Sequence, residues 1–397
     1  MIVLVFNVGG SSLKYQLIDT TDKQWICKGS IEKLGETDAQ WNHLNDERIV
    51  YPKVPEKFEE IVPTIVKLAN LTGYTIELIA HKIAFGGPKH LAPTILTPLV
   101  INEIEEYVSA FPVHLPPALQ IIRIIASDFP NFIQVGVFEP GFHRSIPEYA
   151  RVYGLPYELC AKYGIQRYGF HGVSHSYVTQ WVKEKTGRYP QRMISCHLGS
   201  GTSVCGIRNG ESIGISSGFT PQSGTLMSTR HGELDPHAIL YLMKKEVLSI
   251  DEITELLTKQ SGLLGISGIS GDLRSLQAAA TQGNYRAQLA IDAFCHSVIR
   301  YIGEYYVMLQ GLDVLTFTGG IGENSSLIRQ KISAALSFTG LKLDEAANQG
   351  ENEELISTPD SSIKVYVIKA EEELAVVSQA VALVYEKSRD QGGISKK

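Results

Sequence analysis

Short apolar runs, broken by a turn rich in glycine and serine, open the chain. Ile2 to Phe6 is a continuous β-prone run, and an alternating stretch from Tyr15 to Ile18 follows the turn. This pattern predicts a β-hairpin, with Trp25 to Lys28 as a candidate third strand. Beyond it, helices are expected at Val54 to Leu71 and Pro116 to Phe129, and strands at Ile76 to Ala84 and Phe132 to Val137.

The same arrangement returns in the second half of the chain. From Met193, Met-Ile-Ser-Cys-His-Leu is followed by Gly-Ser-Gly-Thr-Ser and Val-Cys-Gly-Ile, which matches the strand, turn and strand between Leu4 and Tyr15. A separation of about 190 residues is too long for a solenoid repeat and indicates duplication of a domain. We therefore expect two similar domains that face each other.

Three further elements are expected towards the end of the chain. Tyr285 to Leu309 predicts a long helix, and Val314 to Thr318 predicts a strand that ends in Gly-Gly-Ile-Gly-Glu-Asn. Glu371 to Glu386 predicts the last helix, and the tail from Gln391 to Lys397 is expected to fray.

Composition and charge exclude several classes of protein. A chain of 397 residues is longer than one hydrophobic core usually serves, which again favours two domains with a cleft between them. Hydrophobic residues make up 44% and charged residues 20%, as in an ordinary globular protein. The formal charge of -6 argues against a nucleic-acid-binding protein. We also expect no membrane span, because no segment is apolar over the roughly 20 residues that one requires.

The cysteines and the N-terminal run bear on location. The five cysteines are odd in number, scattered and never in a Cys-x-x-Cys arrangement, which favours a reduced protein. The short run after Met1 lacks the basic start and cleavage site of a signal peptide. A cytoplasmic location is therefore expected.

Two turns have the composition of phosphate-binding hairpins. Asn7 to Lys14 combines glycines, which let backbone amides approach a ligand, with serine hydroxyls and a lysine. His197 to Ser203 is the second such turn. One such turn alone is explained equally well by an ordinary glycine-rich hairpin, but the pair favours phosphate binding, because a polyphosphate held from opposite sides would need both. A third glycine-rich turn, Gly319 to Asn324, precedes a helix, whose N-terminus favours anions.

Phosphoryl transfer requires positive charge near the moving group and a metal held by carboxylates. Arg230, within Met-Ser-Thr-Arg-His-Gly, and Lys82, at the end of a strand, are suitable cations. Glu139 is an acidic candidate in Val-Phe-Glu-Pro-Gly. Glu371 to Glu373 open the last helix, where acidic residues also complement the helix dipole.

His171, in Arg-Tyr-Gly-Phe-His-Gly, precedes His175 by four residues, the spacing of two metal ligands on one helix face. The intervening residues lack the glutamate of a zinc protease, so a zinc site is not predicted. Isolated histidines are more often structural or surface groups, and we interpret four others in that way. These are His43, His90, His237 and His296.

In this order, these segments resemble the acetate kinase family, a branch of the superfamily that includes actin, sugar kinases and heat-shock chaperones. The resemblance extends from Asn7 to about Leu374. Its most specific segments are Asn7 to Leu17, Arg167 to His175, Cys196 to Gly201, Gly218 to Pro221, Gly224 to Pro236, Ser261 to Arg274 and Phe317 to Asn324.

The resemblance implies an α/β fold of duplicated ribonuclease H-like domains, as in actin-like ATPases, with a central cleft. The N-terminal domain would span 1–148, joined by the C-terminal helix 372–397, and the nucleotide-binding domain would span 149–371. The resemblance also implies a homodimer and reversible, direct phosphoryl transfer from Mg-ATP to a short carboxylic acid such as acetate, giving an acyl phosphate.

Residue roles follow from the resemblance position by position. Catalytic roles fall on His171, Arg230, Lys82 and Glu139. The acid would contact Lys82, Ala84, Val113, Phe170 and Pro221, with His114 near the reacting phosphoryl group. ATP and its phosphates would contact Asn7, Ser12, Lys14, His197, Gly199, Ser200, Gly201, Asp272, Leu273, Arg274, Gly320, Ile321, Gly322 and Asn324. Magnesium would be held by Asn7 and Glu372, with Glu139 also serving it.

Several positions depart from the residues usual in the family. Lys82 replaces arginine, which keeps the charge but loses the two-pronged contact with a carboxylate. Glu139 replaces aspartate and is one methylene longer. Ala84 replaces valine, so we expect propionate to be accepted at least as well as acetate. The remaining departures are Gly10 for Ser, Phe85 for His, Leu115 for Asn and Ser200 for Asn.

Three alternatives stay open. A propionate or butyrate kinase would differ only in the acid it phosphorylates. A non-catalytic nucleotide-binding relative would fit the departures at Lys82 and Glu139, although the presence together of His171, Arg230 and Asn7 favours an enzyme. A sugar kinase or chaperone-like ATPase on the same fold lacks support from the segments around His171 and Arg230.

Overall fold

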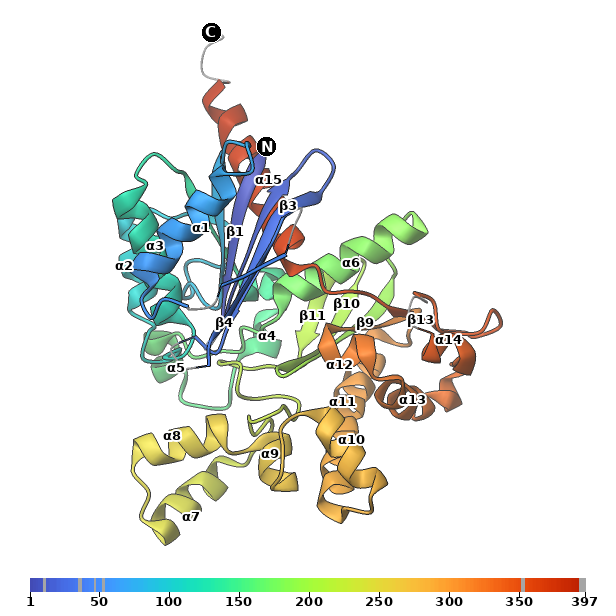
Figure 1. Ribbon diagram of the computed structural model, residues 1–397. Coiled ribbons are helices and arrows are strands. Elements are labelled where there is room, and N and C mark those ends of the chain that lie inside the picture. The colour runs from blue at the N-terminus through green and yellow to red at the C-terminus, as the bar shows by residue number, and fades with distance from the viewer. Residues whose placement is uncertain (10–11, 35–37, 46–47, 52–53, 351–353, 393–397) are drawn as a thin grey trace. The chain divides into compact units, whose positions relative to one another are not determined.

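The computed structural model describes residues 1–9, 12–34, 38–45, 48–51, 54–350 and 354–392 and contains two β-sheets (Figure 1). The chain divides into two compact units. Unit 1 comprises Met1–Gly141 and Glu371–Lys397, and unit 2 comprises Phe142–Ala370. Of the tail predicted to fray, residues 393–397 lie outside the described part.

Unit 1 is built on a sheet with the strand order β5-β4-β3-β2-β1-β6-β8-β7. Neighbouring strands from β5 to β1 are antiparallel, whereas β6 and β8 run parallel to β1. The strands are β1 (Ile2–Val8), β2 (Ser12–Asp19), β3 (Gln24–Glu32), β4 (Gln40–Leu44), β5 (Arg48–Tyr51), β6 (Leu78–Ile83), β7 (Thr94–Ile95) and β8 (Gln134–Phe138).

Helices cover both faces of this sheet. Alternation along β1 sends Leu4 and Phe6 into a core that also contains buried residues of α1 (Phe58–Asn70) and α3 (Leu115–Asp128). Val3 and Val5 point the other way and are also buried, because α15 (Glu372–Gly392) packs on β1, β2, β6 and β8. Unit 1 also contains α2 (Pro98–Glu105).

Unit 2 is built on a sheet with the order β11-β10-β9-β12-β13. Its strands are β9 (Arg192–Leu198), β10 (Thr202–Arg208), β11 (Glu211–Ile215), β12 (Val314–Thr318) and β13 (Lys364–Val367). The long helix α11 (Tyr285–Leu309) packs against β9 and β10 and supplies much of the core. The other helices are α4 (Glu148–Arg151), α5 (Tyr157–Tyr163), α6 (Gly172–Thr186), α7 (Pro236–Glu246), α8 (Ile250–Lys259), α9 (Gly262–Ser267), α10 (Leu273–Thr281), α12 (Gly319–Asn324), α13 (Ser326–Ala334) and α14 (Glu345–Gln349).

The two predicted hairpins are present and are built alike. β1 pairs antiparallel with β2 and parallel with β6, and β9 pairs antiparallel with β10 and parallel with β12. The helix predicted from Val54 begins at Phe58, and β3 is longer than the predicted strand at Trp25 to Lys28. Strands β4 and β5 were not predicted, because their sequences are short and partly polar. The expected domain boundary at 148/149 stays a prediction. Among the residues that the structure describes, no helix has the length and apolar character needed to cross a membrane.

Candidate active site

Lys82 lies at the centre of an ion-pair cluster in unit 1. It sits near the end of β6, directly beside Asn7 of β1, because the two residues are partners in the parallel register. Its Nζ lies 2.6 Å from Oε1 of Glu139, the residue after β8, and 2.6 Å from Oε2 of Glu372, the first residue of α15. Two strand ends and one helix start therefore bring these three side chains together.

The cluster is largely shielded from water. The side chains of Lys82 and Glu139 are only 14% and 8% exposed. Burial by itself would lower the pKa of Lys82, but the charges of Glu139 and Glu372 outweigh it and raise that pKa above its usual value. The ammonium group is therefore charged at neutral pH.

Asn7 connects the first turn of α15 to the hairpin. Its Nδ2 donates to Oε1 of Glu373 at 3.0 Å and to Oε2 of Glu372 at 3.4 Å. Glu373 is buried. In the sequence it is only the last of three consecutive glutamates, and no contact was predicted for it. Glu372 and Glu373 thus have specific partners, beyond complementing the helix dipole.

The donor set of this cluster suits a hard divalent cation. Three carboxylates and the Asn7 amide offer oxygen ligands, and one ammonium group leaves a net negative charge. In the described ranges, no three His, Cys, Asp or Glu side chains converge as a ready-made metal site. The ammonium of Lys82 instead lies between Glu139 and Glu372.

His171 is the centre of a second cluster, in unit 2. It is the residue before α6 and adopts a left-handed backbone with φ of 56°. Its Nδ1 lies 2.9 Å from Ser203 Oγ, which also bonds to His175 Nε2 at 2.8 Å. Its ring stacks on His197 with centroids 4.3 Å apart, and His197 bonds to Ser174. The ring of His171 is therefore fixed in position and direction.

The Nε2 edge of that ring faces the turn between β9 and β10. A Cβ added at Gly201 would lie 3.0 Å from His171 Nε2 and 3.5 Å from Arg230 Nη1. Arg230 also donates to the carbonyl of Pro221 at 3.1 Å, and burial lowers its pKa from the usual value. The structure therefore brings His171 and Arg230 to the same glycine.

Both ring nitrogens of His175 are used by serines. Nδ1 bonds to Ser195 and Nε2 to Ser203, and burial holds the pKa of His175 well below its usual value. His175 is thus a neutral hydrogen-bonding group that supports Ser203. The four-residue spacing of His171 and His175 places both rings on Ser203, so the spacing is explained by hydrogen bonding to that serine.

A hollow of about 680 Å³ adjoins the same turn. Of the predicted ATP residues, it is lined by Gly199, Ser200, Asp272, Leu273, Arg274, Gly320, Ile321 and Asn324. Asp272 caps α10 by accepting from the backbone of Arg274, and the two side chains form an exposed ion pair. Gly319, at φ of 77°, approaches the carbonyl of Leu198 so closely that a Cβ would lie 2.7 Å from it.

Some residues of this hollow were not predicted, and some predicted ATP residues, Gly322 among them, do not line it. Ser228, Thr229 and Gln277 also line it. Gly322 is buried under Phe317 and is not among the lining residues. Ser228 and Thr229 directly precede Arg230 in its motif, whereas Gln277 on α10 belongs to no motif and is identified only by the packing of that helix.

The remaining predicted residues are divided between the units. Ser12 and Lys14 lie on β2, and the turn before them is closed by a 2.7 Å bond from Gly9 N to Ser12 O. In unit 1, Ala84 follows β6, Val113 is exposed and His114 precedes α3. In unit 2, Phe170 and Pro221 are buried. How these residues contribute to an acid site stays a prediction.

Comparison with known proteins gives a consistent result. The model of the acetokinase family matches residues 2–378. Acetate kinases of Dictyoglomus thermophilum and Heliobacterium modesticaldum are 42% and 39% identical, covering 98% and 97% of this chain and all of theirs.

Solved structures show the same similarity. Acetate kinase of Porphyromonas gingivalis aligns with a TM-score of 0.87 at 36% identity, over 96% of this chain and 99% of its own. A propionate kinase of Francisella tularensis aligns with a TM-score of 0.90 at 33% identity, over 95% of this chain and 98% of its own. The predicted mixed α/β fold is thereby confirmed, and the chain belongs to the acetokinase family.

Proposed function

We propose that the chain is an ATP-dependent kinase that reversibly phosphorylates acetate or propionate to an acyl phosphate by direct transfer. The observation that carries this proposal lies within unit 2. The 680 Å³ hollow is lined by Gly199 and Ser200, and the next residue, Gly201, is where His171 and Arg230 converge. A nucleotide in the hollow would direct its phosphates towards these two side chains.

The transferring phosphoryl group carries negative charge over its outer oxygens, so catalysis depends mainly on placed donors and cations. Arg230 supplies a permanent charge. His171 faces Gly201 through Nε2, and the bond from Ser203 to Nδ1 holds the ring in that direction. Both groups are held before the reaction begins, which lowers the cost of orienting them.

We assign the acid's carboxylate to Lys82. Its ammonium already binds the carboxylates of Glu139 and Glu372, so the position suits a carboxylate ligand. Glu372 and Asn7 would hold Mg²⁺, which when bound neutralises charge on the nucleotide phosphates. Glu139 would keep Lys82 oriented, and the Asn7 side chain would be steadied by Glu373.

The choice between acids rests on Ala84. Its small side chain leaves more room than a valine would, which supports propionate as well as acetate. A homodimer and a cytoplasmic location are also proposed, and sedimentation of the purified protein would test the first.

The deciding experiment is a hydroxamate-trapping assay with Mg-ATP and acetate, propionate or butyrate. We expect acyl phosphate from the two shorter acids, and a loss of more than a hundredfold in Arg230→Gln and Lys82→Met. Absence of acyl phosphate with every acid, while the protein still binds ATP by calorimetry, would favour a non-catalytic relative. Efficient turnover of butyrate alone would indicate a butyrate kinase.

A further inference from the structure

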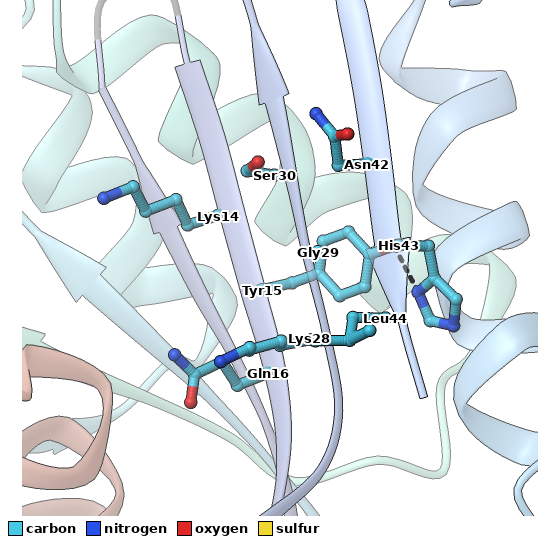
Figure 2. Close-up of a pocket in the computed structure, with 9 residues that line it drawn as sticks. All are labelled: Lys14, Tyr15, Gln16, Lys28, Gly29, Ser30, Asn42, His43 and Leu44. Atoms are coloured by element: carbon cyan, nitrogen blue, oxygen red, sulfur yellow. Dashed lines mark hydrogen bonds between the residues drawn. The ribbon is translucent and has the colours of Figure 1, made fainter. Parts of the chain in front are cut away.

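A polar hollow on the sheet of unit 1 shares only one residue, Lys14, with the proposed reaction. It has a volume of about 400 Å³ and lies over β2, β3 and β4 (Figure 2). Six side chains that line it are Lys14, Gln16, Lys28, Ser30, Asn42 and Leu44. It includes one predicted phosphate residue, Lys14, together with five residues for which no role was predicted.

Strand register explains why these side chains share one face. Lys14 is paired with Ser30, and Ser30 with Asn42. In the next row, Gln16 is paired with Lys28, and Lys28 with Leu44. Directly paired residues point to the same side of a sheet, so the two rows form one surface, as Figure 2 shows.

The opposite face of the same strands is locked into the core. Tyr15 bonds through its hydroxyl to His43 Nδ1 at 2.8 Å and accepts from Trp41 Nε1 at 3.0 Å. Its ring crosses Gly29 so closely that a Cβ there would lie 2.3 Å from it. The floor of the hollow is therefore rigid backbone, a suitable support for a binding site.

The lining side chains offer positive charge and hydrogen-bond donors without a carboxylate. Within the described ranges, neither Lys14 nor Lys28 takes part in an ion pair, whereas Lys82, Lys89 and Lys185 do. Lys28 Nζ lies 4.2 Å from the ring centroid of Trp25, which steadies its ammonium without neutralising it. Acidic residues flank the hollow without lining it: Glu32 is opposite Ser12, one row further along, and Glu372 and Glu373 bond to Asn7, the partner of Lys14 on β1.

We propose that this hollow is a binding site for a phosphate anion, separate from the phosphates of ATP. Lys14 and Lys28 stand diagonally on neighbouring rows, a separation that long side chains can bridge around one small dianion, and Ser30 and Asn42 line the same hollow. Lysine acts on phosphate as a point charge, whereas a carboxylate site would favour the planar fork of arginine.

The row of Lys14 continues through Asn7 to Lys82. Lys14 is thus shared with the phosphate path of the proposed reaction, and it is not a suitable residue for a selective test. Lys28 and Asn42 line the hollow and are not among the residues assigned to the proposed reaction.

Calorimetric titration of the full chain with inorganic phosphate, without nucleotide, tests the proposal. We expect Lys28→Gln and Asn42→Ala to weaken phosphate binding at least tenfold, with Lys28→Arg retaining most of it. Lys67→Gln, an exposed lysine on α1, and Arg230→Gln should bind as the unaltered protein does. Circular dichroism would verify that each variant is folded.

Three results would overturn the proposal. The first is no binding of phosphate by the unaltered protein at millimolar concentration. The second is loss in Arg230→Gln with normal binding in Lys28→Gln and Asn42→Ala, which would place phosphate at the reaction site. The third is tighter binding of citrate than of phosphate, which would indicate a carboxylate site. None of these readouts depends on turnover, so the outcome is independent of the proposed function.

Discussion

Lys82 donates a 2.6 Å hydrogen bond to Glu372, although the two residues are 290 positions apart in the sequence. Glu139 contacts the same ammonium at 2.6 Å. The lengths of the lysine and the two glutamates therefore match one another. A substitution that alters one length without the other should disturb the cluster.

Exchanging Lys82 and Glu139 for the residues usual in the family tests this match. We expect Lys82→Arg and Glu139→Asp each to lower kcat/KM for the acid about tenfold, because one lengthens and the other shortens a buried contact. The double variant should recover to within about threefold, which corresponds to a coupling energy of about 2 to 3 kcal/mol. The hydroxamate assay measures all four proteins.

A matched pair on the surface serves as control. Arg123 and Glu105 form an ion pair in which both side chains are about half exposed. Arg123→Lys and Glu105→Asp should leave kcat/KM unchanged, because exposed pairs contribute little. Purely additive losses in the buried pair would contradict the proposed compensation.

Gly201→Ala should remove activity without unfolding the protein. The new methyl group would lie between His171 Nε2 and Arg230 Nη1, in the space that we assign to phosphate oxygens. We expect kcat to fall by about a hundredfold or more, the scale of losing one placed donor, with little change in Tm. Gly154→Ala is the control, because a Cβ there meets nothing within 4 Å. Normal kcat in Gly201→Ala would separate this turn from the reaction.

The cations and the glycine-rich turns of the site could be predicted from the sequence, because each is identified by a few consecutive residues. Lys82 ends an apolar strand, and Gly201 lies in a turn that repeats the one after Asn7. The contacts of Glu373 and Ser203 depend instead on how α15 and β10 pack on distant elements. The spacing of hydrophobic residues along a segment does not reveal which distant element packs on it, and within their own segments Glu373 and Ser203 are ordinary polar residues.

The contacts of the acidic residues at the start of α15 could not be predicted from the sequence either. A first helical turn rich in glutamate is explained by the helix dipole alone, and only the resemblance to a family assigned Glu372 a function. The structure adds its contact with Lys82. Charge patterns thus predict which segments are helical more reliably than they predict partners.

Buried histidines should make the folded state sensitive to acid. Burial lowers the pKa of His81 to about 4, opposed in part by its hydrogen bond with Gln134. In the unfolded chain the value is about 6.5, so between these limits the unfolded state binds more protons. Stability is complete above about pH 6.5 and declines as the pH falls towards 4. His143, also shifted to about 4 by burial, acts in the same direction.

Thermal unfolding at pH 7.5, 6 and 5 measures this effect. Tm should fall with pH less steeply in His81→Gln, which keeps a hydrogen-bonding side chain near Gln134, than in the unaltered protein. His237→Gln, at an exposed position, should follow the unaltered protein. Equal slopes in all three proteins would show that His81 does not contribute to the acid response.

Ala84→Val should shift the preference from propionate towards acetate. Ala84 stands two positions after Lys82, the residue that we assign to the acid's carboxylate, and it is only partly buried. Valine would add two methyl groups there. Because one methylene in a small pocket changes the activation free energy by about 1 to 3 kcal/mol, we expect the kcat/KM ratio of propionate to acetate to fall about tenfold. Ala92→Val, at an exposed position in the same unit, should leave that ratio unchanged. Acyl hydroxamate formed from each acid gives the ratio directly, and the same ratio in Ala84→Val as in the unaltered protein would mean that Ala84 does not limit the length of the acid.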